Sequence, residues 1–230
     1  MLESSTPTAS SSDGEVIVLA GGDTVDAAIR HLLPNDAAVI AADSGLALAP
    51  ILGLTVDLVV GDLDSVDPDQ LTAARAAGAD VDRHPVDKDR TDLAIALDAA
   101  MTRSPARITV VGGHGGRLDH LLANAALFGA AAYADTRIVA RMGHATLTVV
   151  RGGRPATELS GTPGELVSLL AVHGAASSIT TSGLRFPLDG QDLAAGSSQG
   201  VSNEFTGDRA LVALQDGVLL VVQPGETDQG

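Results

Sequence analysis

Short apolar runs alternate with Ala- and Leu-rich helical stretches from residue 15 to about residue 142. Continuous apolar runs are typical of strands covered on both faces, and the stretches between them end at Gly or Pro. The predicted strands are 15–20, 37–43, 56–62, 107–113 and 136–142. The predicted helices are 25–33, 45–53, 67–78, 91–103 and 118–133. Alternating strands and helices indicate β-α-β crossovers, so we expect a Rossmann-like α/β domain with a mainly parallel sheet over residues 15–142.

From about residue 143 onward, the apolar runs are separated by Gly, Pro and Ser, without a long amphipathic helix. This pattern predicts a second, all-β domain over residues 143–230, which we expect to be a sandwich or an open barrel. Residues 210–222 predict a β-hairpin, because Asp216 and Gly217 fit a two-residue type I′ turn. The polar residues 1–14 predict a disordered tail.

Composition narrows the classes of function. The chain has 230 residues, 19% charged and 45% apolar, which is typical of a globular protein. Its net charge of −15 argues against a nucleic-acid partner or an anionic membrane surface, because both require basic patches. The absence of cysteine excludes thiolate catalysis and Cys-ligated metal sites. We find neither a signal-peptide pattern nor a membrane-spanning apolar run, so we expect a soluble, cytoplasmic protein.

Acidic residues close two of the predicted strands. Asp43 ends the strand at 37–43, and Asp62 and Asp64 follow the apolar run of the strand at 56–62. In a parallel α/β sheet, ligands gather at the carboxyl ends of the strands, so these side chains should meet at one edge. Asp62 and Asp64 project to the same side if the backbone stays extended, and close carboxylates repel unless a cation lies between them. The alternative is a simple turn, for which Asp, Ser and Pro are common.

The stretch DKDRTDL adds two acids and two bases. Asp89 and Asp92 are three residues apart, so we expect them to share a helix face near its amino end. In the structural interpretation, Asp89 caps the helix and Asp92 complements its dipole. That interpretation leaves Lys88 and Arg90 in the same turn unexplained. Acids beside bases at a helix start also hold Mg²⁺ together with phosphate, because Mg²⁺ prefers oxygen ligands from carboxylates, water and phosphate.

The most informative stretch is GGHGGRLDHLLANAALF, residues 112–128. Its glycines allow the backbone to approach a ligand, and the helix start that follows offers free N–H groups to an anion. Arg117, His120 and Asn124 lie on one helix stripe, with Asp119 beside them. A solvated helix face is one explanation of these polar residues. The rest of the helix is Ala, Leu and Phe, however, so we expect it to be buried and its polar groups to have partners or a function.

Six short motifs occur in order along the chain: ADSG, GDLDS, DKDRTD, GGRLDH with the following Asn124, GLRFPL and SNE. Through these motifs, the sequence resembles the thiamine pyrophosphokinase (thiamine diphosphokinase) family over roughly residues 39–224. The resemblance implies an α/β domain that binds ATP and Mg²⁺, a C-terminal β-sandwich, and a homodimer with thiamine bound between its subunits. It also implies transfer of the terminal diphosphate of ATP to the hydroxyl of thiamine, with release of AMP.

The matching motifs carry over a set of expected roles. Asp62 and Asp64 would be Mg²⁺ ligands, with Asp89 and Asp92 completing the metal and phosphate site, and these four acids with Arg117 form the expected catalytic set. The expected ATP- and phosphate-binding set is Asp43, Lys88, Thr91, Gly113, Gly116, Arg117, Asp119, His120 and Asn124. The expected thiamine-binding set is Phe186, Ser202 and Asn203.

Two positions depart from the family pattern. The family often places an aromatic residue, sometimes Trp, against the thiamine pyrimidine; this chain has no Trp, and Phe186 is the natural substitute. Leu63 stands in GDLDS where Phe is common, and its side chain should point into the sheet.

Three other functions stay open from the residues alone: a diphosphokinase for another heterocyclic alcohol such as a hydroxymethylpterin, a Mg²⁺-dependent phosphohydrolase, and a non-catalytic nucleotide-binding module.

Overall fold

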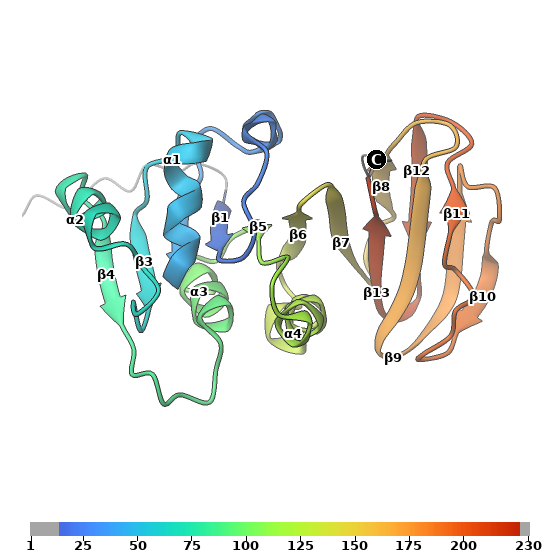
Figure 1. The fold of residues 1–230 in the computed structure, drawn as a ribbon. Helices are drawn as coiled ribbons and strands as arrows, with labels where there is room; N and C mark the ends of the chain where they lie inside the picture. The colour runs from blue at the N-terminus through green and yellow to red at the C-terminus, as the bar shows by residue number, and fades with distance from the viewer. Residues whose placement is uncertain (1–13, 226–230) are drawn as a thin grey trace, which may run out of the picture.

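The computed structural model of the chain describes residues 14–225 (Figure 1). The tail predicted at 1–14 therefore lies outside the described residues, apart from Gly14. Over the described range, none of the helices combines the length and the apolar character that crossing a membrane requires.

Six parallel strands form the first part of a large sheet. They are β1 (Glu15–Ala20), β2 (Ala38–Ala42), β3 (Leu58–Gly61), β4 (Asp80–Arg83), β5 (Arg107–Gly112) and β6 (Arg137–Met142). Their spatial order is β4-β3-β2-β1-β5-β6. The predicted parallel pairing is confirmed for this part of the chain. The sequence pattern did not indicate β4, because its segment DVDR has one apolar residue and is mostly exposed.

Short helices connect these strands. They are η1 (Ala27–Leu32), η2 (Asp43–Ala47), α1 (Leu48–Leu52), α2 (Pro68–Ala76), α3 (Asp92–Met101), α4 (Leu118–Phe128) and η3 (Ala131–Tyr133), where η denotes a 3-10 helix. Asp67 caps α2 by accepting hydrogen bonds from two backbone N–H groups. Gly53 ends α1 in the left-handed conformation with φ 60°. Both helix ends agree with the sequence prediction.

Two predicted helices are wrong in type or extent. The stretch 25–33 forms only the 3-10 helix η1, which buries Ile29 alone and therefore lacks the apolar stripe that stabilises an α-helix in a protein. The helix predicted at 118–133 ends at Phe128. Gly129 follows it at a close approach, where an added Cβ would lie 2.7 Å from the ring of His173.

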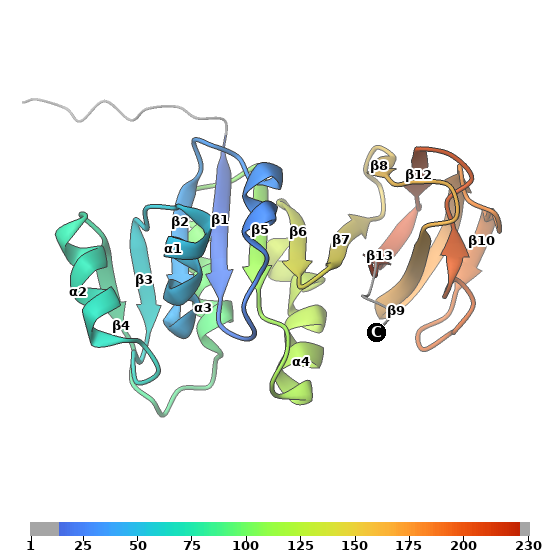
Figure 2. The ribbon, with the colours of Figure 1, turned by 45° about the horizontal axis from the view of Figure 1, so that its top comes forward.

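Helices cover both faces of the parallel part of the sheet (Figure 1 and Figure 2). On one face, Leu97 of α3 and Phe128 of α4 are fully buried in a core with residues of β1, β2, β5 and β6. On the other face, Ile29 of η1 and Leu52 of α1 pack in a second core against Ile17. These two cores fix the strands so that their carboxyl ends lie along one edge.

Beyond β6 the sheet continues, but its strands become antiparallel. They are β7 (Ala145–Arg151), β8 (Thr157–Ser160), β9 (Leu166–Ser182), β10 (Asp189–Leu193), β11 (Asn203–Glu204), β12 (Arg209–Ala213) and β13 (Asp216–Gln223). The order within the described residues continues β6-β7-β13-β9-β12-β8, with β10 and β11 paired to β9. A third apolar core, which includes Val150 and Leu219, lies among these strands. The structure is therefore a mixed sheet whose second part is built from strands alone.

The hairpin predicted at 210–222 is wrong. β12 pairs with β8 and β9, whereas β13 pairs with β7 and β9, so the long strand β9 lies between them. Gly217 has φ 94° and lies at a register shift at the start of β13, where an added Cβ would be 2.5 Å from the carbonyl oxygen of Ala175. The Asp-Gly pair thus permits a close approach of β13 to β9 instead of a two-residue turn.

Candidate active site

The carboxyl ends of β2, β3 and β5 border one cavity of about 700 Å³. Most of the residues predicted for ATP and Mg²⁺ line it: Asp43, Asp62, Asp64, Lys88, Thr91, Asp92, Gly113, Gly116, Arg117, His120 and Asn124. Within the part of the chain that the structure describes, Asp89 and Asp119 do not line this cavity. The prediction that polar residues at the carboxyl ends of the parallel strands meet in one site is therefore confirmed for most of them.

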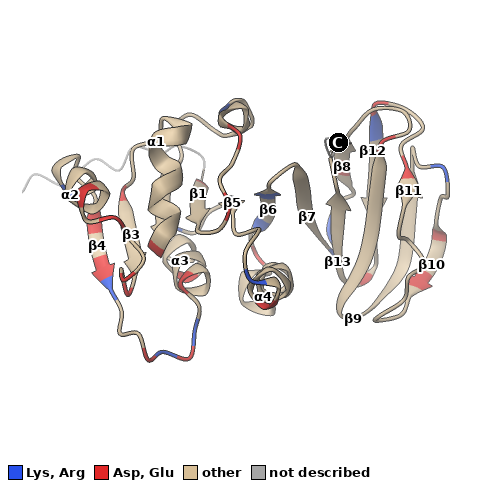
Figure 3. Cartoon of the chain, viewed as in Figure 1, with Lys and Arg blue, Asp and Glu red and all other residues tan. Residues whose placement is uncertain are grey.

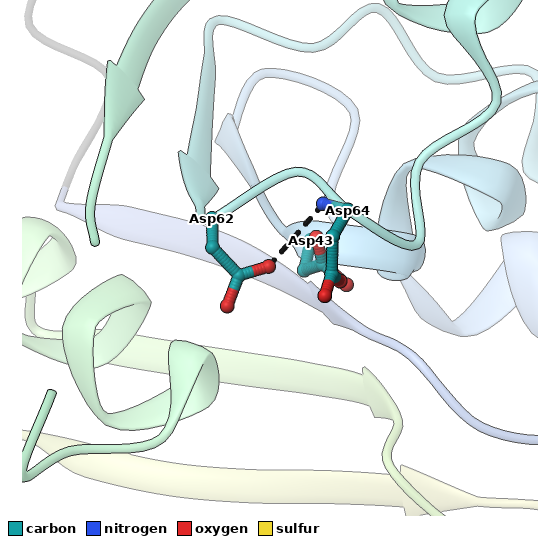
Figure 4. Close-up of side chains that lie close together, drawn as sticks. All are labelled: Asp43, Asp62 and Asp64. Carbon is teal, nitrogen blue, oxygen red and sulfur yellow. Dashed lines mark hydrogen bonds between the residues drawn. The ribbon is translucent and has the colours of Figure 1, made fainter. Parts of the chain in front are cut away.

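Asp43, Asp62 and Asp64 form the centre of this site (Figure 4). Each offers a carboxylate oxygen, and the three oxygens lie within 4.8 Å of one another. Of the two arrangements that the sequence left open, the turn is observed: Leu63 has φ 66° and the backbone N–H of Asp64 donates to Oδ1 of Asp62 at 3.2 Å. The chain turns here, and burial of the Leu63 side chain, which is 8% exposed, holds the turn in place.

Electrostatics at these acids favour a bound cation. Burial raises the pKa of Asp43, and the carboxylates of Asp92, Asp62 and Asp64 raise it further, against a hydrogen bond at Ser44 that lowers it. Oδ1 of Asp43 is buried without a hydrogen-bond partner among residues 14–225. Carboxylate oxygens are the ligands that Mg²⁺ prefers, so three carboxylates, one of which has a buried oxygen without a hydrogen-bond partner in the described range, fit this ion.

Lys88 lies against the same acids. Its Nζ is 2.7 Å from Oδ2 of Asp62 and 3.0 Å from Oδ1 of Asp92, and its side chain is 13% exposed. The hydrogen bond from Lys88 lowers the pKa of Asp62. Asp92 begins α3, and the N-cap is Thr91, whose Oγ1 accepts from the backbone N–H of Ala94 at 3.2 Å. The cap at Thr91 fixes where the helix starts and thereby places Asp92 at the cavity.

The structure does not bring Asp89 into the acidic cluster. Because Thr91 caps α3, Asp89 precedes the helix, so neither its predicted role as a cap nor a helix face shared with Asp92 is observed. Asp89 is exposed and lines a different cavity, together with Asp82 and Asp98. Asp43, which was expected to position substrate or metal, lies beside Asp62 and Asp64, where Asp89 was expected.

The glycine-rich loop after β5 forms another wall of the cavity. Gly112 has φ 89°, and an added Cβ would lie 2.3 Å from the carbonyl oxygen of Ala20, so only glycine allows β1 and β5 to approach this closely. Gly113, Gly115 and Gly116 also have positive φ. Asn124 supports the loop from α4: its buried side-chain amide donates to the carbonyl oxygen of Gly113 at 3.2 Å.

The expectation that α4 is buried is wrong. Leu118 and Leu122 are 67% and 62% exposed, whereas Asn124 is the polar residue that is buried. Arg117 and Asp119 are both exposed and pair with each other, with Nη2 of Arg117 2.6 Å from Oδ2 of Asp119. This pairing lowers the pKa of Asp119 and keeps the guanidinium at the cavity entrance. The periodicity of α4 identified an apolar helix but not which side would be covered.

The sequence interpretation missed several polar residues of the cavity, among them Ser44, Ser65 and His114. Nδ1 of His114 is buried without a hydrogen-bond partner within the described range, and its backbone oxygen accepts from the N–H of Asp23 at 2.8 Å. The loop after β1, which includes Gly21 and Gly22, also lines the cavity. The signal was present: β1 is a central strand, so the same strand-end principle applies to the GGDT segment that follows it, residues 21–24.

The residues expected to bind thiamine lie in the other part of the molecule. Phe186 and Asn203 line a separate cavity of about 310 Å³, near β10 and β11, whereas Ser202 does not line it. The Asn203 side chain is 3% exposed; it accepts from the backbone N–H of Phe186 at 3.0 Å and donates to the Phe186 carbonyl at 2.7 Å. The ring of Phe186 is 58% exposed, with the guanidinium of Arg185 5.3 Å from its centre. Asn203 therefore fixes the loop that presents Phe186.

Comparison with known proteins identifies two matching family models. Residues 29–140 match the catalytic domain of thiamin pyrophosphokinase, and residues 156–219 match its vitamin B1 binding domain. A thiamine pyrophosphokinase of Bacillus subtilis is 25% identical over 186 residues, which is 80% of this chain and 86% of the relative.

Solved structures agree with this match. A thiamine pyrophosphokinase structure from Bacillus subtilis superposes with a TM-score of 0.81 at 22% identity and covers 93% of this chain and 100% of its own. One from Geobacillus thermodenitrificans has a TM-score of 0.77 at 26% identity and covers 93% of this chain and 99% of its own. The 700 Å³ cavity around Asp43, Asp62 and Asp64, here called the acidic cavity, lies mainly in the part that matches the catalytic model. The 310 Å³ cavity at Phe186, here called the Phe186 cavity, lies in the part that matches the vitamin-binding model. With both models matched in order along one chain, the protein belongs to the thiamin pyrophosphokinase family.

Proposed function

We propose that this chain is a thiamine diphosphokinase, which transfers the diphosphate group of ATP to the hydroxyl of thiamine and releases AMP. The observation that carries the proposal is the convergence of Asp43, Asp62 and Asp64 beside Lys88 at the edge of the sheet. Diphosphate transfer depends mainly on positioning and on neutralising charge, and little covalent chemistry is required of the protein. A cavity lined by both acidic and basic side chains can position the reactants and neutralise the charge of the phosphates.

Each part of the cavity has a proposed role. Asp43, Asp62 and Asp64 would hold Mg²⁺, which when bound supplies positive charge next to the phosphates. Lys88 and Arg117 pair with phosphate oxygens, and Asp92 holds the ammonium of Lys88 toward the cavity. The N–H groups of the glycine loop and of the start of α4 face anionic oxygens. We expect in-line attack of the thiamine hydroxyl on the β-phosphorus, without a phospho-enzyme.

The two cavities support a homodimer in which each active site uses both chains. Within the described residues, the cavity at Phe186 shares no lining residue with the cavity at Asp62. Figure 1 draws β10 and β11 at the opposite end of the molecule from β3. Thiamine held near Phe186 would therefore meet ATP bound to a second copy. Leu118 and Leu122 are exposed on α4, the helix that begins beside the acidic cavity, and they provide apolar surface for such a contact.

Mixing two inactive variants tests this arrangement. Asp62→Ala lacks the acidic cluster and Phe186→Ala lacks the thiamine contact, so each alone should be inactive or nearly so. A mixed dimer with shared sites has one intact site, so co-refolding equal amounts should restore about a quarter of the wild-type activity by statistical pairing. Sites contained within single chains would give no recovery, and that result would refute the shared site.

The remaining expectations concern organisation and location. We propose that residues 15–142 form a Rossmann-like nucleotide-binding domain and that the predicted domain 143–230, of which residues 226–230 lie outside the described residues, is a β-sandwich over 143–225, with the division next to Met142. The change from parallel to antiparallel strands between β6 and β7 supports this division. A cytoplasmic location stays a prediction.

Product analysis tests the proposed reaction against its alternatives. Incubation with ATP, Mg²⁺ and thiamine should yield AMP and thiamine diphosphate in equal amounts, with little AMP when thiamine is omitted. AMP release with a hydroxymethylpterin and not with thiamine would indicate a diphosphokinase for another alcohol. Phosphate or pyrophosphate release without an acceptor would indicate a phosphohydrolase. Nucleotide binding without any product would leave only a binding module.

A further inference from the structure

A second polar cavity, of about 460 Å³, lies on the face of the sheet formed by β5, β6 and β7. Its floor carries three arginines, Arg107 on β5 and Arg137 and Arg141 on β6. Arg107 is the direct neighbour of Arg137 in the parallel pairing of these strands, and Arg141 lies two side chains further along the same face. We refer to this cavity as the arginine groove.

The arginine groove lies in a gap on one face of the sheet. The helices that cover the parallel strands end on one side of it, and the strands that pack over the antiparallel part begin on the other. On this face, Val111 belongs to the core under α1 and η1, and Val150 belongs to the core of the antiparallel part. Between them, the groove is walled by Leu32 of η1 on one side and by Glu158 and Ser160 of β8 on the other. The floor is deep, since Thr109 and Thr148 are only 6% and 5% exposed.

Three guanidinium groups in one cavity are unusual in a chain that has 14 basic residues and a net charge of −15. Figure 3 shows basic residues, in blue, on β6, in a chain that is otherwise coloured mostly tan or red. Partial desolvation lowers the pKa of Arg141 and of Arg137, although Arg137 is exposed on one side, and the charge of Arg107 lowers both pKa values further. The three cations therefore repel one another in a partly desolvated place, which a protein tolerates at lower cost when an anion is present.

The local carboxylates leave much of this charge uncompensated. Arg107 pairs with Glu15 at 3.2 Å, but the side chain of Arg137 forms no ion pair or hydrogen bond within residues 14–225, and only its backbone N–H donates, to the carbonyl of Ala106. Nη1 of Arg141 donates to Oγ1 of Thr146 at 2.6 Å, while its Nε is buried without a hydrogen-bond partner in the described range.

The two glutamates of the groove are engaged with other groups. Glu158 lies 3.4 Å from Arg209. Glu165 accepts hydrogen bonds from the N–H of Thr162 at 3.0 Å and from the side chain of Gln223 at 3.2 Å. Free donors of Arg137 and Arg141 therefore face the cavity with little competition from protein acceptors.

We propose that the arginine groove binds a multivalent phosphate anion, at a site separate from the acidic cavity. Guanidinium groups pair with phosphate oxygens through two parallel hydrogen bonds, and adjacent arginines on neighbouring strands provide several such pairs. The volume is in the range of cavities that hold small ligands. The phosphate comes either from an inorganic anion or from a nucleotide, and the site is independent of the reaction proposed for the acids.

Calorimetric titration of the full chain in Mg²⁺-free buffer, with inorganic phosphate, pyrophosphate and AMP in separate runs, tests the proposal. We expect the double variant Arg137→Gln, Arg141→Gln to bind the preferred anion about tenfold more weakly than wild type, or to lose one binding event. Arg75→Gln removes one positive charge from exposed α2, as Arg137→Gln alone does from the groove, and should bind as wild type does. Only the binding that the double variant weakens is assigned to the groove: a larger share of it with AMP than with both inorganic anions would identify a nucleotide, and the reverse would identify an inorganic anion.

A second measurement separates loss of binding from loss of folding. In wild type, the Nε–H resonance of Arg141, assigned by its disappearance in Arg141→Gln, should shift as the anion is added. Circular dichroism checks each variant, and Arg137→Gln alone replaces the double variant if the latter is unfolded. Equal affinity in wild type and the folded variant, or an unchanged Arg141 resonance at saturation, would overturn the proposal.

Discussion

The ammonium nitrogen of Lys88 lies 2.7 Å from Oδ2 of Asp62, and both side chains are largely buried, at 13% and 12% exposed. Asp92 contacts the same ammonium at 3.0 Å. Lys88 thus compensates part of the negative charge that Asp43, Asp62 and Asp64 bring together. A partly buried charge that loses its partner destabilises its surroundings, so each change in this group should alter binding as well as rate.

Replacing Lys88 should separate metal binding from catalysis. In Lys88→Gln, the acids lose a competing cation, so we expect Mg²⁺ alone to bind several-fold more tightly, by titration calorimetry without nucleotide. The kcat/KM for ATP should fall by about 100-fold, because a charge that pairs with phosphate is lost. Unchanged kcat/KM would show that Lys88 does not contact the phosphates.

Asp64→Asn and Asp89→Asn form a matched pair, since both remove one charge from an exposed aspartate near the site. Asp64 belongs to the cluster of three carboxylates, so its replacement should lower kcat by about 100-fold or more and raise the Mg²⁺ concentration needed for half-maximal rate. Asp89 lines another cavity, so Asp89→Asn should stay within about threefold of wild type. Steady-state AMP release at varied Mg²⁺ measures both, and equal losses would restore Asp89 to the metal site.

Asn203→Ala should affect thiamine and not ATP. The buried amide forms two hydrogen bonds to the backbone of Phe186, and their loss should lower the free energy of unfolding by about 1–3 kcal/mol. The loop that presents Phe186 should loosen, so the KM for thiamine should rise while the KM for ATP stays unchanged. Ser202→Ala is the control, because Ser202 is exposed and outside the Phe186 cavity. An equal effect of both substitutions on thiamine would contradict this assignment.

The titration of Tyr133 provides a pH test of the fold. Burial raises the pKa of its phenol to about 12, with further contributions from the charge and hydrogen bond of Asp98, which accepts from the phenol at 3.1 Å. The folded pKa lies above the ordinary value of 10.0, so the stabilisation is present below pH 10 and is lost as the pH rises from 10 toward 12.

Tyr133 is the single tyrosine of a chain that has no tryptophan, so phenolate absorbance reports this residue alone. We expect ionisation near pH 12 or together with alkaline unfolding. Tyr133→Phe should remove this part of the pH dependence of stability, measured by denaturant unfolding at several alkaline pH values. Ionisation of the folded protein near pH 10 would show that the phenol is not buried as described.

The parallel strands and the site at their carboxyl ends could be predicted because each strand is a continuous apolar run and because parallel strands end at the same edge. That principle placed Asp43, Asp62 and Asp64 together from two separate sequence segments. The sequence could not show that Leu63 adopts a positive φ, or that Thr91 and not Asp89 caps α3, since both depend on the packing of neighbouring segments.

Errors in the second half have one physical origin. The Asp216–Gly217 pair has the residues of a tight turn, but β9 is long enough, at 17 residues, to pair with β13 along one part and β12 along another. Local turn preference therefore gives way to pairing that is distant in sequence. The exposure of Leu122 on α4 was equally hidden, because an Ala- and Leu-rich helix has the same pattern whether or not the rest of its own chain covers its outer face.

The most direct test of the acidic cluster is ³¹P NMR of the reaction of wild type and Asp62→Ala with ATP, Mg²⁺ and thiamine, after circular dichroism has shown that both are folded. We predict equal amounts of AMP and thiamine diphosphate from wild type and no detectable product from Asp62→Ala. Turnover at the wild-type rate in folded Asp62→Ala, or ADP and thiamine monophosphate as the wild-type products, would contradict a diphosphate transfer that depends on Asp62.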